Sequence, residues 1–153
     1  MTIMEISGLL MMTGLVMCLC GCNGTALKGD SEELPPPGDG ELHLNKKTVV
    51  FTSDGGEDSV YDIYGVKLYL DEVKSRVGES AEITHPLGDG NPYVAYTTID
   101  GGWFKLELDD DGAVLRCRVG GNDAREMRKV FVRVTSMPPA ESGSFEVVQS
   151  GVE

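Results

Sequence analysis

The stretch of sequence that decides the fold is residues 103–119, WFKLELDDDGAVLRCRV. Apolar side chains alternate with polar ones on both sides of an acidic segment that ends in Asp111-Gly112. Alternation with a period of two is typical of a strand with one buried face, and Asp-Gly supplies the positive φ that a hairpin turn needs. We therefore predict strands at 103–108 and 113–119, joined by a solvated acidic turn.

Similar patterns recur on both sides of this hairpin. From Lys46 onward, short runs rich in Val, Ile, Thr, Tyr and Phe are separated by Gly, Asp, Asn and Pro at fairly regular spacing. This spacing is typical of all-β domains, and we expect about seven strands. The candidate ranges are 47–53, 58–64, 66–70, 93–99, 103–108, 113–119, 129–135 and 144–149, with one candidate too many among the first three. The sequence predicts a single all-β domain, a β-sandwich, over residues 46–153.

Residues 66–77 fit two patterns. Val66, Leu68 and Leu70 alternate as in a strand. Leu70, Val73 and Val77 also share one face of a helix with Val66. We prefer a strand at 66–70 followed by a short helical turn.

The N-terminal segment, residues 1–21, predicts a lipoprotein signal peptide. Its uncharged run, Leu9–Leu19, has about the length of a signal-peptide apolar core and is short for a membrane span. Cys22 follows a glycine, whereas Cys18 and Cys20 follow bulky residues that do not suit cleavage. The segment before Cys22 resembles a bacterial lipobox, although no basic residue precedes the apolar run. The resemblance implies that Cys22 is acylated and anchors the chain to a membrane.

Two other interpretations of the apolar run remain open, namely simple secretion with cleavage nearby and an uncleaved anchor. All of them place the domain outside the cytoplasm, and lipidation places it in the cell envelope, at the outer membrane, facing either the periplasm or the surface. Residues 22–45 are polar and contain Pro35-Pro36-Pro37-Gly38, so they predict a disordered linker after the lipidated cysteine.

Several short segments carry a resemblance to a known family. They are 51–60, FTSDGGEDSV, the Trp103-Phe104 pair, Asn122, Arg128, and 145–151, FEVVQSG. Together they resemble the BACON domain, the Bacteroidetes-associated, carbohydrate-binding, often N-terminal module. The resemblance implies an immunoglobulin-like β-sandwich and a role in glycan binding or adhesion. Some family members act as spacers, so a structural spacer or accessory subunit of an envelope complex is the alternative.

The charge and the histidine content limit the function classes. The chain has 25 acidic and 13 basic residues, a net charge of −12, which repels phosphate backbones and excludes nucleic acid as a natural partner. Only His43 and His85 are present, neither at the spacing of a zinc site, and we expect both to be exposed. We therefore predict a protein without catalysis, metal or organic cofactor, and keep a hydrolase as a remote alternative. Cys117 shares the apolar parity of its strand, so we expect a buried, inert thiol.

Candidate ligand-binding residues are aromatic or basic. Trp103 falls on the polar side of its strand, which favours either packing at a corner of the core or a platform for a sugar ring, with Tyr93 and Tyr96 as weaker companions. Six basic residues cluster on two strands and their connection: Arg116, Arg118, Arg125, Arg128, Lys129 and Arg133. If these strands pair as a hairpin, one outward face carries Arg116, Arg118, Lys129 and Arg133. That face is either neutralised by nearby carboxylates or binds an acidic glycan, such as a mucin-type ligand, or an acidic partner.

Overall fold

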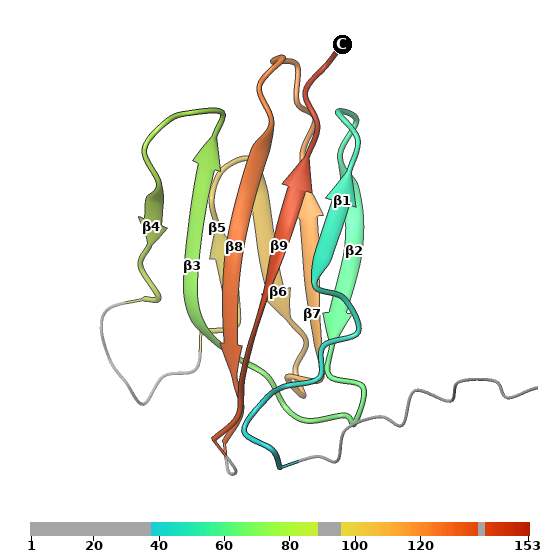
Figure 1. Cartoon of the computed structure of the whole chain (residues 1–153), viewed down its shortest axis with the longest axis vertical. Coiled ribbons are helices and arrows are strands. Elements are labelled where there is room, and N and C mark those ends of the chain that lie inside the picture. The colour runs from blue at the N-terminus through green and yellow to red at the C-terminus, as the bar shows by residue number, and fades with distance from the viewer. Residues whose placement is uncertain (1–37, 89–95, 138–139) are drawn as a thin grey trace, which may run out of the picture. The chain divides into compact units, whose positions relative to one another are not determined.

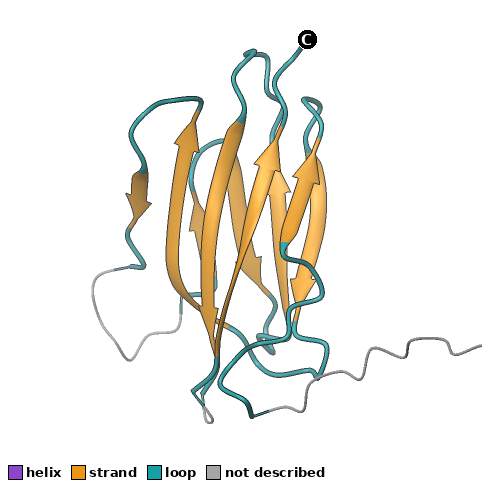
Figure 2. Ribbon diagram, viewed as in Figure 1, coloured by secondary structure: helices purple, strands orange, loops and turns teal. Residues whose placement is uncertain are grey.

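Two β-sheets face each other in the computed structural model, which describes residues 38–88, 96–137 and 140–153. Strands and loops account for these residues, and none of them forms a helix (Figure 2). No apolar helix of membrane-spanning length occurs in the described ranges. The predicted signal peptide, Cys22, most of the linker and Tyr93 lie outside the described residues.

The sheets have five and four strands, labelled in Figure 1. The five-stranded sheet has the order β1 (Thr48–Phe51), β9 (Ser142–Gln149), β8 (Arg128–Thr135), β3 (Tyr69–Val77) and β4 (Ile83–His85). The four-stranded sheet has the order β2 (Gly56–Tyr61), β7 (Val114–Val119), β6 (Phe104–Leu108) and β5 (Thr98–Asp100). β1 pairs with β9 in parallel, and every other neighbouring pair is antiparallel. The all-β sandwich is confirmed, with nine strands in the described ranges where about seven were expected.

The β6–β7 hairpin confirms the strands and the acidic turn predicted from the alternation of apolar and polar residues. Buried and partly exposed residues alternate along β6, and its residues pair in register with β7. The Asp109 carboxylate accepts hydrogen bonds from the backbone N–H groups of Ala113, at 2.7 Å, and Val114, at 3.2 Å. Gly112 has a φ of +70°. The acidic turn is therefore held by its own carboxylate and by a glycine in the left-handed region.

The prediction of a helical turn after residue 70 is wrong, because β3 continues to Val77. A β-bulge shifts the register between Leu70 and Glu72, so that Leu70 and Val73 both face the core although they are three residues apart. A bulge adds one residue to a strand, and this extra residue produces the spacing that resembled a helix. β4, which has only three residues, was not predicted.

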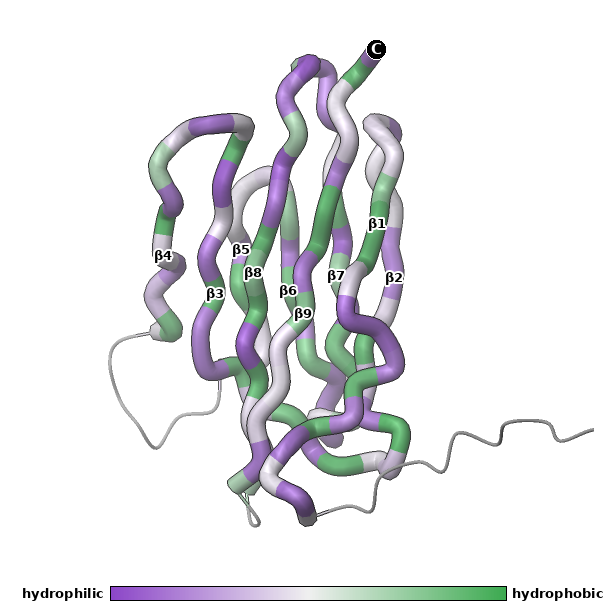
Figure 3. The backbone as a smooth tube through the Cα atoms, in the orientation of Figure 1, coloured by the Kyte–Doolittle hydropathy of each residue, from purple (hydrophilic) through white to green (hydrophobic). Residues whose placement is uncertain are grey.

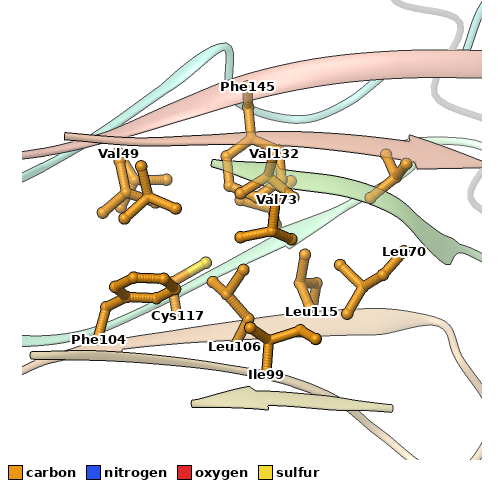
Figure 4. Close-up of a cluster of buried hydrophobic side chains, with 14 of the residues drawn as sticks. Val49, Leu70, Val73, Ile99, Phe104, Leu106, Leu115, Cys117, Val132 and Phe145 are labelled. Carbon is orange, nitrogen blue, oxygen red and sulfur yellow. The ribbon is translucent and has the colours of Figure 1, made fainter. Parts of the chain in front are cut away.

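The core lies between the sheets. Val49, Val132 and Phe145 of the five-stranded sheet face Phe104 and Leu115 of the other sheet (Figure 4). Apolar and polar residues alternate along the strands, as the colours in Figure 3 show. Burying each such side chain contributes about 1.5–3 kcal/mol, which makes the interior between the sheets the main source of stability.

The domain starts earlier than the predicted boundary at residue 46. Leu42 and Leu44 are buried in the core, and Glu41 and Leu44 form β-bridges with Ser142 and Asp62. Leu42 and Leu44 are two apolar residues in an otherwise polar segment, too few to predict from the sequence that the segment contributes to the core. In Figure 1 the chain near residue 40, in cyan, lies at the opposite end of the sandwich from the labelled C-terminus.

The connection from β7 to β8 crosses from one sheet to the other, so the predicted hairpin between these strands is wrong. Asn122 is buried in this connection, and its side-chain amide donates hydrogen bonds to the carbonyl oxygens of Glu126, at 2.9 Å, and Ser150, at 3.0 Å. These bonds tie the crossing to the chain beyond β9. The two arginine-bearing strands consequently present their outward faces on opposite sides of the sandwich.

Candidate functional site

A shallow hollow lies beside Trp103, at the end of the sandwich near the C-terminus. Its volume is about 520 Å³, and it is open to solvent. The start of β2, the turn between β5 and β6, and the end of β7 form its walls. The residues that line it are Gly56, Glu57, Asp100, Gly102, Trp103, Phe104, Lys105, Arg118, Val119 and Gly120.

The β5–β6 turn sets the position of Trp103. Asp100 accepts a hydrogen bond from the Gly102 N–H at 2.9 Å, and Gly102 has a φ of +85°. The Gly101 N–H donates to the Phe104 carbonyl at 2.9 Å, which closes the turn. The Trp103 carbonyl accepts from the Gly120 N–H, also at 2.9 Å, and this bond joins the turn to the end of β7.

The Trp103 side chain is half-buried and makes two packing contacts. Its indole lies edge-on to the Phe104 ring, with 5.0 Å between ring centroids and 70° between ring planes. The Arg128 guanidinium lies over the indole, 5.5 Å from the ring centroid, at a cation–π distance. Trp103 thus packs against the core, as one of the two predictions had it, and also lines the hollow, while its role as a ligand platform stays a prediction.

Charged side chains form a chain of ion pairs across β2, β7 and β6. Arg118 pairs with Glu57 at 2.5 Å and approaches Glu107 at 3.9 Å, and Lys105 pairs with Glu107 at 3.2 Å. The hydrogen bond from Lys105 lowers the pKa of Glu107, and the hydrogen bond to Glu57 raises the pKa of Arg118. The groups are exposed, so these pairs add little stability and mainly fix where charged donors and acceptors stand.

Of the predicted ligand-binding residues, Trp103 and Arg118 both line the hollow. Arg116 shares the outward face of β7, opposite Glu107, but does not line it. Arg133 lies on β8, in the other sheet, where it pairs with Asp71 at 2.5 Å. The prediction of one face shared by Arg116, Arg118, Lys129 and Arg133 is therefore wrong. The crossing after β7 separates the first two residues, on β7, from the last two, on β8.

Tyr96 does not reach the hollow either. It precedes β5 whereas Trp103 follows it, so the length of that strand separates the two aromatic side chains. The Tyr96 ring packs so closely over Gly88 that a Cβ atom there would lie 1.6 Å from it. The ring is therefore committed to packing within its own segment.

The two histidines are not the exposed residues that the sequence predicted. The His85 ring accepts or donates a hydrogen bond with Ser75 Oγ at 2.7 Å and lies edge-on to Phe104, with 5.1 Å between centroids. His43 is partly buried, edge-on to Tyr64, with its Nε2 3.3 Å from Asp39. In both cases strand and loop pairing brings distant residues against the ring.

Cys117 is fully buried in the core, as predicted. Burial, with a smaller contribution from Asp58, raises the pKa of its thiol to about 12. The thiolate is the reactive form of cysteine, so this side chain is chemically inert in the folded protein.

Three charged residues that line the hollow were not singled out from the sequence: Glu57, Asp100 and Lys105. Glu57 and Arg118 are 61 residues apart in the chain, and no local pattern brings them together. The arrangement pairs an aromatic surface with charged hydrogen-bonding groups around an open depression. Such a surface can stack a ring and bind its hydroxyl groups.

Comparisons with known proteins show what the fold resembles. An NMR structure of a protein from Bacteroides thetaiotaomicron superimposes with a TM-score of 0.55 at 17% identity, covering 80% of this chain and 98% of that one. The likeness is one of fold. No family model matches the chain, and no curated protein matches it.

A second solved structure overlaps less. It is a nucleoside hydrolase-related hypothetical protein from Saccharophagus degradans, described as associated with carbohydrate metabolism. It gives a TM-score of 0.31 at 11% identity, over 69% of this chain and 22% of that one. At this level of superposition it has no bearing on the fold or function of the present chain.

Proposed function

We propose that this chain is a non-enzymatic, lipid-anchored protein of the cell envelope whose β-sandwich binds glycan in the hollow beside Trp103. The half-buried indole at the edge of an open hollow of about 520 Å³ is the observation that carries the proposal. Contact with Phe104 and Arg128 fixes the ring before any ligand arrives. A ring that is already fixed loses little conformational entropy when a ligand binds. This low cost favours binding of ligands that make few contacts in an open site, such as oligosaccharides.

The charged groups around the indole suit sugar hydroxyls. Glu57, Lys105 and Arg118 line the hollow, and their ion pairs hold donors and acceptors in place on one rim. Hydrogen bonds to charged groups contribute about 1.5–3 kcal/mol each when water is displaced, more than bonds between neutral groups. One stacked ring and two or three such bonds are enough for a contact with one glycan. When several such contacts form at once, the overall affinity increases through multivalency.

The fold supports an assignment to the immunoglobulin-like sandwiches and, through the sequence resemblance, to BACON-like modules. β1 pairs in parallel with the last strand, β9, while β2 lies in the opposite sheet beside β7. Two packed sheets of short, mainly antiparallel strands, with connections that cross from one sheet to the other, are the architecture of immunoglobulin-like domains. The source of the solved structure, Bacteroides thetaiotaomicron, is consistent with the Bacteroidetes association of the family that the sequence resembles.

We also propose that the protein is not an enzyme, because both acids that line the hollow already have partners. Glu57 is ion-paired with Arg118, and Asp100 is engaged by the Gly102 N–H within its own turn. A general acid has to present its carboxyl oxygen to the substrate, whereas the Glu57 carboxylate already accepts the Arg118 Nε–H at 2.5 Å. These acids therefore fix the shape of the hollow rather than transfer protons.

A glycan and mucin array with the full-length chain in mild detergent tests the proposal. We expect binding that is lost in Trp103→Ala and weakened in Arg118→Ala, with Arg116→Ala as the matched control because it lies on the same strand face outside the hollow. Circular dichroism checks that each variant is folded. Binding by Trp103→Ala and Arg118→Ala at the strength of the natural chain would refute the site, and no binding by the natural chain would favour the spacer.

A further inference from the structure

The outer face of the five-stranded sheet carries two cations directly opposite each other. Arg76 on β3 and Lys129 on β8 are register partners, so their Cβ atoms are about 4.5–5.5 Å apart. Like charges in this position destabilise a sheet. The chain has 25 acidic and only 13 basic residues, so a general excess of basic side chains does not explain the pair.

Two other cations on the same face, Lys74 and Arg133, have acidic partners. Lys74 pairs with Glu72 at 2.9 Å and with Glu82 at 3.7 Å, and Arg133 pairs with Asp71 at 2.5 Å. Within residues 38–88, 96–137 and 140–153, no carboxylate forms an ion pair with Arg76 or Lys129. Lys129 is half-buried as well, so part of its side chain packs against its neighbours on the sheet.

The two cations stand between two hollows. One, of about 330 Å³, is shared with Gly78, Glu79 and Met127. The other, of about 130 Å³, adjoins Phe131 and Glu146. There is room for a ligand on both sides of the cations. Three glutamates line these hollows, Glu79, Glu82 and Glu146, and none of them forms an ion pair with Arg76 or Lys129 in the described ranges.

An aromatic side chain lies beside the two cations. Phe131 follows Lys129 by two positions on β8, which places both on the outward face about 6.6–6.8 Å apart. Its cross-strand neighbours are Lys74 on one side and Glu146 on the other. A partly exposed ring next to two uncompensated cations suits a sugar that bears a negative group, because the ring can stack while the anion binds the cations.

We propose that Arg76 and Lys129 bind an oxyanion, a sulfate ester or a carboxylate, carried by an acidic polysaccharide whose ring stacks on Phe131. An anion between the cations replaces their repulsion with two charge-assisted hydrogen bonds. This site is separate from the hollow beside Trp103, which lies against the other sheet. It does not depend on the function proposed for that hollow.

Thermal unfolding of the full-length chain in sodium sulfate and in sodium chloride of equal ionic strength tests the anion site. Sulfate should raise the Tm of the natural chain above its value in chloride, because a ligand that binds the folded state stabilises it. Arg76→Gln and Lys129→Gln should keep only the smaller gain that sulfate gives through its exclusion from protein surfaces, and should have a higher Tm in low-salt buffer, since the repulsion is gone. Arg133→Gln, on the same face but ion-paired, should keep the gain. An equal sulfate gain in all variants, or none in the natural chain, would overturn the site.

Binding of chondroitin sulfate, polygalacturonate and neutral dextran identifies the source of the anion. We expect the two acidic polymers to bind and dextran not to bind at this site, with Arg76→Gln weakening the acidic polymers about tenfold, the value of one charge-assisted hydrogen bond. Phe131→Ala should weaken polymer binding while keeping the sulfate gain in Tm. Trp103→Ala should leave that gain unchanged, so failure of one site is distinguishable from failure of the other. A response to inorganic sulfate without binding of either acidic polymer would overturn the polysaccharide as the occupant.

Discussion

The environment of a single side chain decides its chemistry, and Cys117 is the clearest case. Its side chain is fully buried between the sheets, and burial raises the pKa of the thiol to about 12. Parity along one strand was enough to predict this position, because Leu115 and Val119 face the same way and are buried too. No partner from elsewhere in the chain was needed for that inference.

We predict that Cys117 in the folded protein resists alkylation by iodoacetamide at pH 8. The same residue should react quickly in about 6 M guanidinium, a concentration that unfolds most small domains. Mass spectrometry of the peptide that contains Cys117, released by cleavage after glutamate residues because arginines flank the cysteine, measures both rates. Labelling at the same rate in both conditions would contradict the burial.

The same shift predicts an effect of pH on stability. The thiol pKa is about 12 in the folded state against 9.0 for an exposed thiol, so above pH 9 the unfolded chain binds fewer protons than the folded one. This contribution to stability is complete below pH 9 and is lost as pH rises toward 12. Urea unfolding of the natural chain and of Cys117→Ala should therefore converge in stability as pH increases from 8 to 11. Parallel pH profiles would show that Cys117 does not contribute.

The pKa of His85 is shifted in the opposite direction to that of Cys117. Burial lowers the pKa of its imidazole below the ordinary value of 6.5, so the unfolded chain binds the proton first as pH falls. We expect an NMR titration midpoint below 6.5 in the folded protein and near 6.5 in urea. Stability should decline as pH falls from 7 through the folded midpoint, and His85→Gln should reduce that decline. A folded midpoint at or above 6.5 would refute the prediction.

The position of His85 could not be predicted from the sequence. Its hydrogen bond to Ser75 depends on the pairing of β3 with β4, and its contact with Phe104 depends on the opposite sheet. β4 has three residues, too few to show a periodic pattern. Local alternation is informative for a side chain only where the strand is long enough to display it.

Elements were predictable where their pattern was regular and were misread where it was interrupted. β6 and β7 alternate without a break and were placed within one residue of their bounds. β3 contains a bulge between Leu70 and Glu72, which changed the apparent period. Turns that need a positive φ were recognised from glycine and aspartate, and Gly55 in the β1–β2 turn is one of them.

We predict that Gly55→Ala is much more destabilising than Gly102→Ala, although both glycines have positive φ, +81° and +85°. A Cβ at Gly55 would lie 2.2 Å from the Val119 carbonyl oxygen, whereas a Cβ at Gly102 meets nothing within 4 Å. The left-handed conformation alone costs about 1–2 kcal/mol, so Gly102→Ala should lose that amount. Gly55→Ala should lose at least about 3 kcal/mol because the backbone of β7 has to move.

Denaturant unfolding followed by circular dichroism measures both values at equal temperature and salt. Gly102→Ala is the matched control, since it has the same backbone conformation without the close contact. Equal losses for the two variants would mean that the turn adjusts freely and that the contact with Val119 does not constrain it.

At the scale of the whole domain, the candidate site depends on pairings that no local pattern contains. Arg118 meets Glu57 from 61 residues away, and the crossing at Asn122 decides that Arg116 and Arg133 face opposite sides. A cluster of basic residues in sequence therefore became two separate surfaces. The sequence identified Trp103 and Arg118 as candidate ligand contacts, while the fold supplied Glu57, Asp100 and Lys105.

The chain near residue 40 lies at one end of the sandwich, and the labelled C-terminus lies at the other (Figure 1). Gly120, which lines the hollow beside Trp103, accepts a hydrogen bond from Gln149 at 2.7 Å. We predict that Cys22 carries the lipid. In cells fed a clickable palmitate analogue, the natural chain should be labelled and should enter the detergent phase of a Triton X-114 partition. Cys22→Ala should lose the label and move to the aqueous phase, whereas Cys18→Ala and Cys20→Ala should behave as the natural chain. Label retained in Cys22→Ala but lost in Cys20→Ala would move the anchor to the other cysteine, and label in none of the chains would refute lipidation.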